Sequence, residues 1–131
     1  MKIGFVAGAF DLLHAGHIHL FKEAKKYCDQ LVVGLHIDPS IERKYKNKPI
    51  ESLLERGIKL RSCIYVDQIV PYETEADLEQ IFNHWNINIR FIGSDYIDGD
   101  KPITDPDSVE IHYIKSLSIH TSDIRERIRK S

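Results

Sequence analysis

The chain has 131 residues, of which 42% are hydrophobic and 29% are charged, and 18 basic against 20 acidic residues give a formal net charge of −2. This composition allows a packed core and excludes a disordered chain, and the charge balance argues against a general nucleic-acid-binding role. No apolar run approaches the ~20 residues of a membrane span. The first residues are interrupted too soon for a signal peptide, and the two cysteines have no metal-site or C-x-x-C spacing. We therefore expect a single cytoplasmic domain over residues 1–131, with no membrane span and no nucleic-acid partner.

Apolar runs of strand length alternate with amphipathic stretches along the whole chain. In chain order they predict a strand, a helix, a strand, a polar loop, a helix, a strand, a helix, two strands and a helix. This alternation is typical of an α/β domain, and we expect a Rossmann-like, mostly parallel five-stranded sheet flanked by helices. The predicted elements are 2–7, 17–27, 30–36, 37–49, 52–61, 68–71, 74–85, 89–92, 109–114 and 122–130.

Three polar segments follow directly after predicted strands: 8–17, 93–96 and 116–122. Ligands of such sheets bind beyond the carboxyl ends of the strands, so these segments should lie close together.

The most informative of them places two histidines, His14 and His17, on either side of Gly16 at the start of a predicted helix. Free N–H groups at a helix start accept an anion, and two imidazoles beside them suit a phosphate group whose charge grows during a reaction. Two alternatives remain open: a pair of surface histidines, or two ligands of a zinc site. Zinc would need further ligands, and His19 would point about 160° away from His17 on a helix.

The string from Gly8 to His17, G-A-F-D-L-L-H-A-G-H, resembles the G-x-F-D-x-x-H-x-G-H signature of the cytidylyltransferase-like nucleotidyltransferases, and in particular the glycerol-3-phosphate cytidylyltransferases. Further family motifs follow in the same order along nearly the whole chain. They are matched by Lys44 and Lys46, Glu55-Arg56 with Leu60-Arg61, Val66-Asp67, the segment 91–96, and the segment 119–124.

The resemblance implies a reaction between CTP and a phosphorylated small molecule, such as glycerol 3-phosphate or another polyol or sugar phosphate. The acceptor phosphate would attack the α-phosphate in line, and pyrophosphate would leave. It also implies Mg²⁺ on the triphosphate, with Asp11 or Asp95 as nearby carboxylates, and a homodimer. The residues that it marks as catalytic are His14, His17, Lys44 and Lys46.

The resemblance also marks a set of residues that bind the nucleotide or its phosphates. Three of its assignments have a plain structural alternative. The loop 37–49 with Lys44 and Lys46, which we call the lysine loop, could be a solvated charge run. Arg56 could be an exposed partner of Glu51 or Glu55, and Asp95 could be a turn former. Thr121 and Ser122 are also expected to cap the last helix. The full set is Gly8, Ala9, Phe10, Asp11, Gly16, Arg56, Gly93, Asp95, Lys115, Ile119, His120, Thr121 and Ser122.

The sequence departs from the family pattern at a few positions. Ala9 stands where the family has Thr or Ser, and Lys115, Ser118 and His120 replace the Arg, Gly and Ser of R-T-x-G-I-S-T-T. These changes bear on the base and the acceptor more than on the chemistry. The alternatives are an ATP-dependent adenylyltransferase, similar to the heptose-phosphate or FAD-synthetase enzymes, and a nucleotide-binding module without turnover.

Overall fold

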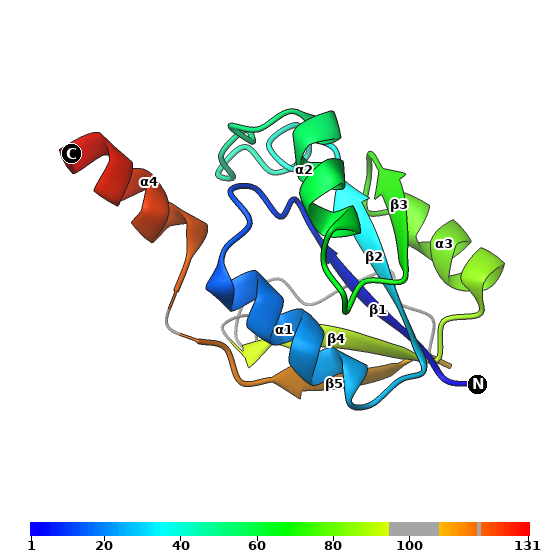
Figure 1. Cartoon of the computed structure of the whole chain (residues 1–131). Coiled ribbons are helices and arrows are strands. Elements are labelled where there is room, and N and C mark those ends of the chain that lie inside the picture. Colours follow the sequence, from blue (N-terminus) through cyan, green and yellow to red (C-terminus); the bar gives the residue numbers. More distant parts are fainter. Residues whose placement is uncertain (95–107, 118) are drawn as a thin grey trace.

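The computed structural model describes residues 1–94, 108–117 and 119–131. The described strands form one five-stranded sheet in the order β3-β2-β1-β4-β5, and every neighbouring pair is parallel. The predicted Rossmann-like sheet is therefore confirmed (Figure 1). The elements are β1 (Ile3–Gly8), α1 (Ala15–Lys25), β2 (Gln30–His36), α2 (Leu53–Arg61), β3 (Gln68–Tyr72), α3 (Asp77–Trp85), β4 (Ile89–Gly93), β5 (Glu110–Ile114) and α4 (Thr121–Lys130).

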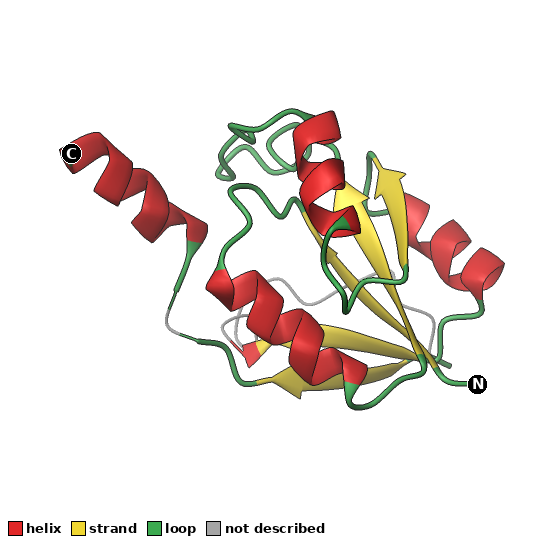
Figure 2. Cartoon of the chain, viewed as in Figure 1, coloured by secondary structure: helices red, strands yellow, loops and turns green. Residues whose placement is uncertain are grey.

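The two faces of the sheet carry two separate hydrophobic clusters, because neighbouring residues of a strand point to opposite faces. In β1, Val6 belongs to the cluster that contains Phe21 of α1 and Leu60 of α2. Phe5 belongs to the other cluster, which contains Leu78 of α3. Helices α1 and α2 thus cover one face of the sheet and α3 covers the other (Figure 2).

Helix α4 takes no part in these layers. None of its described residues is buried, and the helix projects away from the sheet beyond the start of α1 (Figure 1). Among the helices of the described residues, none combines the length and the apolar character needed to span a bilayer.

The helix starts differ from the prediction at three places. Helix α1 begins at Ala15, two residues earlier than expected, because His14 acts as its N-cap. The N-cap of α4 is His120, so Thr121 and Ser122 lie inside the helix and the expected cap by these two residues is wrong. No side chain caps α3 at Ala76, although Asp77 accepts hydrogen bonds from the two backbone N–H groups of residues 73 and 74.

The predicted capping box of α2 is confirmed. The Ser52 hydroxyl accepts a hydrogen bond from the Glu55 N–H at 3.1 Å, and the Glu55 carboxylate accepts one from the Ser52 N–H at 2.9 Å. This reciprocal pair satisfies two donors at the start of α2 and fixes where the preceding loop ends.

Candidate active site

A cavity of about 1170 Å³ opens at the carboxyl ends of the strands. Its walls come from the loops after β1, β2 and β3, from the end of β4 and from the segment between β5 and α4. The strand-end segments predicted to meet do so in their described parts, as expected for ligand sites in open parallel sheets.

The two histidines of the signature stack on each other at the start of α1. Their ring centroids lie 3.8 Å apart with an interplanar angle of 22°. The Nδ1 atom of His14 accepts a hydrogen bond from the Gly16 N–H at 3.0 Å, and the Nδ1 atom of His17 accepts one from the His14 N–H at 3.2 Å. Because both Nδ1 atoms accept, each neutral ring carries its proton on Nε2 and is a donor there.

Burial keeps both imidazoles neutral. The pKa of His17 is lowered to about 3, first by burial and then by the neighbouring His14. The pKa of His14 is also lowered, again chiefly by burial. At neutral pH both rings therefore offer an Nε2–H donor without a charge.

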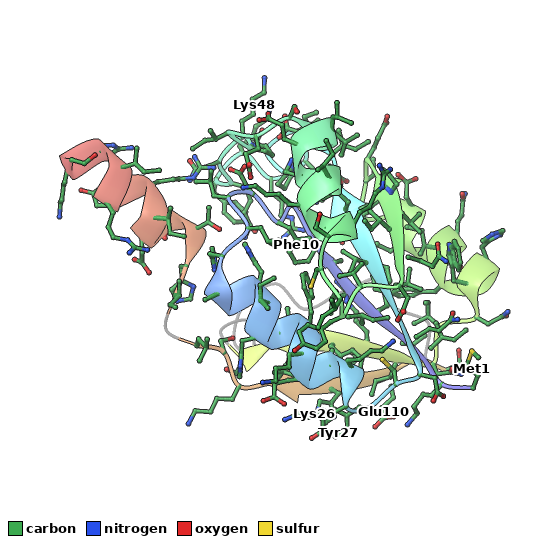
Figure 3. All side chains as sticks on the ribbon, viewed as in Figure 1. Met1, Phe10, Lys26, Tyr27, Lys48 and Glu110 are labelled. Atoms are coloured by element: carbon green, nitrogen blue, oxygen red, sulfur yellow. The ribbon has the colours of Figure 1, made fainter. Side chains whose placement is uncertain are left out.

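The backbone before α1 adopts an unusual path to place these rings. Phe10 and Leu12 have positive φ angles of 49° and 51°, a region that residues other than glycine rarely occupy. The Phe10 ring is buried and meets the rings of His17 and Phe21 edge-on, with centroids 5.4 Å and 5.1 Å away. Figure 3 shows Phe10 within the body of the molecule, beside α2. The two positive φ angles cost conformational energy, and they place the Phe10 ring where it packs against His17.

Gly16 at the start of α1 allows α4 to begin close beside it. A Cβ atom at Gly16 would lie 2.9 Å from the Ile119 carbonyl oxygen and 2.9 Å from His14, closer than real Cβ contacts. Thr121 connects the two helix starts. Its hydroxyl lies 3.2 Å from His14 Nε2 and donates to the Asp11 carbonyl at 3.2 Å. The N-termini of α1 and α4, both of which favour anions, thus meet in the cavity.

A buried carboxylate joins these helix starts to the lysine loop. Asp11 accepts hydrogen bonds from the Ile50 N–H at 2.8 Å and the Glu51 N–H at 2.9 Å. It also pairs with Arg125 of α4, whose Nη2 lies 2.7 Å from Asp11 Oδ2. Asp11 therefore ties three segments together and has few lone pairs left for a metal ion.

Arg125 also lines the cavity and was not predicted. The signal was present in the sequence, since Arg125 follows Thr121 by four residues and so lies on the same face of the last helix.

Arg56 does not reach the cavity, and it is not the exposed partner of a glutamate either. Its side chain is buried, and its guanidinium donates to backbone carbonyl oxygens of three segments. These acceptors are the carbonyls of Ala9, His36, Ile37, Glu51 and Ser52, at 2.7–3.3 Å. Arg56 holds the loops after β1 and β2 to the start of α2.

The structure separates the predicted lysines. Lys46 lines the cavity, whereas Lys44 and Lys115 are exposed and lie outside its walls. Asp95 falls outside the described residues. The other predicted binding residues all line the cavity: Gly8, Ala9, Phe10, Asp11, Gly16, Gly93, Ile119, His120, Thr121 and Ser122.

Further cavity residues were missed by the sequence analysis. They come from β4 and from the ends and following loops of β2 and β3, where no motif or periodicity distinguishes a wall residue from any other polar residue. They include His36, Glu42, Arg43, Tyr72, Glu75 and Arg90.

Within the described part of the chain, no group of three or more His, Cys, Asp or Glu residues is placed to hold a metal ion. The zinc alternative for His14 and His17 therefore finds no third ligand there. His19 instead places its Nε2 atom 3.0 Å from the Lys115 carbonyl oxygen.

The model of the cytidylyltransferase-like family matches residues 5–127 of this chain. The chain belongs to this family. Among the similar proteins, the ethanolamine-phosphate cytidylyltransferase of Mus musculus is 37% identical over 139 residues, which cover 97% of this chain and 34% of that protein. The bifunctional protein HldE of Acidiphilium cryptum is 38% identical over 96 residues, which cover 72% of this chain and 20% of that protein. This family member thus spans about a third or less of the length of these relatives.

Solved structures agree with the family fold. A lipopolysaccharide core biosynthesis protein from Thermoplasma volcanium superposes with a TM-score of 0.74 at 27% identity, covering 90% of this chain and 99% of that chain. Pantothenate synthetase from Thermus thermophilus superposes with a TM-score of 0.58 at 16% identity, covering 96% of this chain and 64% of that chain, which is a likeness of fold alone.

Proposed function

We propose that this family member is a cytidylyltransferase that transfers the cytidylyl group of CTP to the phosphate of a small molecule, with release of pyrophosphate. The proposed acceptor is glycerol 3-phosphate or another polyol or sugar phosphate. The observation that carries the proposal is the meeting of two helix N-termini at a stacked pair of neutral histidines inside one cavity. Such a site suits a polyphosphate and the charge that develops on its oxygens during transfer.

In this reaction an oxygen of the acceptor phosphate forms a bond to the α-phosphorus of CTP. The bond from that phosphorus to the α–β bridging oxygen breaks, and pyrophosphate takes the electron pair. The Nε2–H group of His17 donates to an oxygen of the α-phosphate, where negative charge grows. The Nε2–H group of His14 faces the Thr121 hydroxyl in this structure and exchanges that partner for a second phosphate oxygen. Lys46 and Arg125, which both line the cavity, supply positive charge. The protein therefore acts by positioning and by charge neutralisation.

The expected Mg²⁺ fits this site only as an ion carried by the triphosphate. Asp11 already accepts hydrogen bonds from two backbone N–H groups and from Arg125, and no group of three or more potential ligands among the described residues is placed to hold a metal ion. Carried in with the triphosphate, Mg²⁺ would supply further neutralisation of charge.

The test is pyrophosphate release in the presence of Mg²⁺, with CTP and ATP each crossed against a panel of phosphorylated acceptors. We expect release with CTP and a polyol or sugar phosphate. Matches over 97% of the chain to ethanolamine-phosphate cytidylyltransferases support CTP and place phosphoethanolamine in the panel. Release with ATP alone would establish the adenylyltransferase alternative. If neither nucleotide gives pyrophosphate although CTP still raises the melting temperature, the nucleotide site is intact, and either the acceptor lies outside the panel or the chain is the module without turnover.

Two further expectations stay predictions. One is the homodimer, which light scattering would contradict by giving a particle of about one chain's mass, 15.2 kDa. The other is the cytoplasmic location, which fractionation of the source cells would test.

A further inference from the structure

The cavity continues past the histidine pair to the ends of β2 and β3. We call this part the β2–β3 lobe. Its frame is the ends of β2 and β3 with the loops that follow them, and Arg90 lines it from β4. The proposed function leaves its polar residues without a role. They are His36, Glu42, Arg43, Tyr72, Glu75 and Arg90.

The wall of the lobe holds a half-buried ion pair between Arg43, in the lysine loop, and Glu75, after β3. The side chains of Arg43 and Glu75 are 27% and 29% exposed. The Glu75 N–H also donates to the Glu42 carboxylate at 2.9 Å. These contacts fix a guanidinium donor and a carboxylate acceptor side by side at the cavity surface.

Two stacked rings complete the lobe. His36 and Tyr72 have centroids 4.5 Å apart, and the His36 Nε2–H donates to the Glu73 carbonyl at 3.0 Å. Burial lowers the pKa of His36 and raises the pKa of Tyr72, so both rings are neutral at pH 7. With its proton on Nε2, His36 keeps Nδ1 as an acceptor, and the Tyr72 hydroxyl both donates and accepts.

The formal charges of the lobe cancel, since Arg43 and Arg90 balance Glu42 and Glu75. An ammonium group only donates hydrogen bonds, and it carries a charge whose removal from water a lobe of zero net charge does not offset. A hydroxyl group both donates and accepts, so it fits an Arg–Glu pair and meets no net repulsion.

We propose that the β2–β3 lobe reads hydroxyl groups of the acceptor, with the Arg43–Glu75 pair as the specificity determinant. The site would then select phosphorylated polyols or sugars over phosphorylated amines. This inference rests on the proposed function, in which the acceptor phosphate lies at the histidines and its remainder extends into the lobe.

The first test uses the wild-type chain with CTP and Mg²⁺. It compares kcat/KM for glycerol 3-phosphate, ribose 5-phosphate, phosphoethanolamine and ethyl phosphate, which has no hydroxyl beyond its phosphate. We expect at least one hydroxylated acceptor to exceed ethyl phosphate by about a hundredfold or more, because sites built to bind a hydroxyl reject analogues that lack it. A rate with phosphoethanolamine equal to or above those of the hydroxylated acceptors would overturn the proposal.

The second test is Glu75→Gln, which keeps the size of the side chain and removes its charge. We expect kcat/KM for the hydroxylated acceptor to fall about 10- to 100-fold and that for ethyl phosphate to change less than about threefold. The CTP-induced rise in melting temperature should stay the same. Glu79→Gln, the same change on the exposed side of α3, is the matched control. An equal fall for all acceptors would contradict a role in specificity.

A binding measurement tests the role of the β2–β3 lobe separately from the proposed reaction. If no acceptor releases pyrophosphate with CTP or ATP, the proposed function fails. Calorimetry on the CTP-loaded chain then decides the role of the lobe. Tighter binding of glycerol 3-phosphate or ribose 5-phosphate than of ethyl phosphate, lost in Glu75→Gln, supports it. Equal binding of these probes overturns it.

Discussion

Helices α1 and α4 both begin at the cavity with a histidine as N-cap, but they are held in different ways. Helix α1 is part of the packed layers, and its residues Phe21 and Ala24 are fully buried. Helix α4 buries no side chain and is held to the body by polar contacts of Thr121 and Arg125. Both helices thus place an N-terminus that favours anions at the cavity, but α1 is fixed by packing and α4 has few tertiary contacts.

This difference suggests that α1 and α4 have different roles in the proposed reaction. Groups that must meet the reacting phosphorus within a few tenths of an ångström belong on α1, where packing fixes them. Groups that grip the triphosphate belong on α4, whose position a bound nucleotide can stabilise.

The largest expected effect is that of His17→Ala on the packed side. We expect kcat to fall about a thousandfold, because the change removes a donor to the transition state. The melting temperature should also fall, because the variant loses the contact with Phe10 and the acceptor of the His14 N–H. The matched change on the other helix is His120→Ala, which should mainly raise the KM for CTP. Steady-state kinetics with both variants tests this difference in roles, and equal losses of kcat would contradict it.

The next effect is that of Arg125→Met, which removes the contact between α4 and Asp11. We expect the KM for CTP to rise about tenfold or more and the free energy of unfolding to fall by about 2 kcal/mol, because a buried carboxylate loses its charged partner. Urea denaturation and nucleotide titration measure the two effects. Arg129→Met, at the exposed end of the same helix, is the control and should change neither.

A smaller effect concerns pH. In the unfolded chain His17 takes up a proton near its ordinary pKa of 6.5, whereas in the folded chain it does so only at about 3. The unfolded state therefore binds more protons between these values, and the free energy of unfolding falls as the pH falls through this range. The slope from this residue is at most about 1.4 kcal/mol per pH unit.

Urea denaturation at pH 7, 6 and 5 measures this slope. We expect His17→Gln to lose part of it, while His84→Gln, an exposed histidine of α3, keeps it. Identical pH slopes for His17→Gln and the wild-type chain would show that His17 does not stay neutral through burial.

The smallest effect is that of Gly57→Ala in α2, a helix of the packed side. A Cβ atom at Gly57 would meet nothing within 4 Å, and the residue has no positive φ angle. We expect a gain of about 0.4–1 kcal/mol in the free energy of unfolding, because alanine restricts the unfolded chain more than glycine does. Thermal unfolding and kcat should show greater stability at unchanged turnover. A lower kcat would mean that α2 must move during the reaction.

Much of the fold could be predicted because it depends on local patterns. Strand-length apolar runs, helix periodicity and the Ser52–Glu55 pair act over a few residues, and the parallel sheet follows from their order. The convergence of strand ends could also be predicted from topology. The helix starts were less predictable, because a histidine cap such as His14 depends on the rotamer that its neighbours impose.

The candidate site was only partly predictable for a related reason. His14, His17 and Thr121 belong to motifs and lie together as expected. Arg43 and Glu75 are 32 residues apart in sequence, and only tertiary structure brings them into one ion pair. The tautomers of the two histidines also depend on tertiary structure, since each is set by which ring nitrogen faces a backbone N–H.

The buried position of Arg56 has a consequence for how members of the family should be sorted. Its hydrogen bonds go to the chain's own carbonyl groups, so a descendant that had lost catalysis would still need it to fold. Its presence in a genome-derived sequence is therefore no sign of a working enzyme. Screens for inactive relatives should instead inspect the positions of His14, His17 and Lys46, to which the proposed function assigns the chemistry.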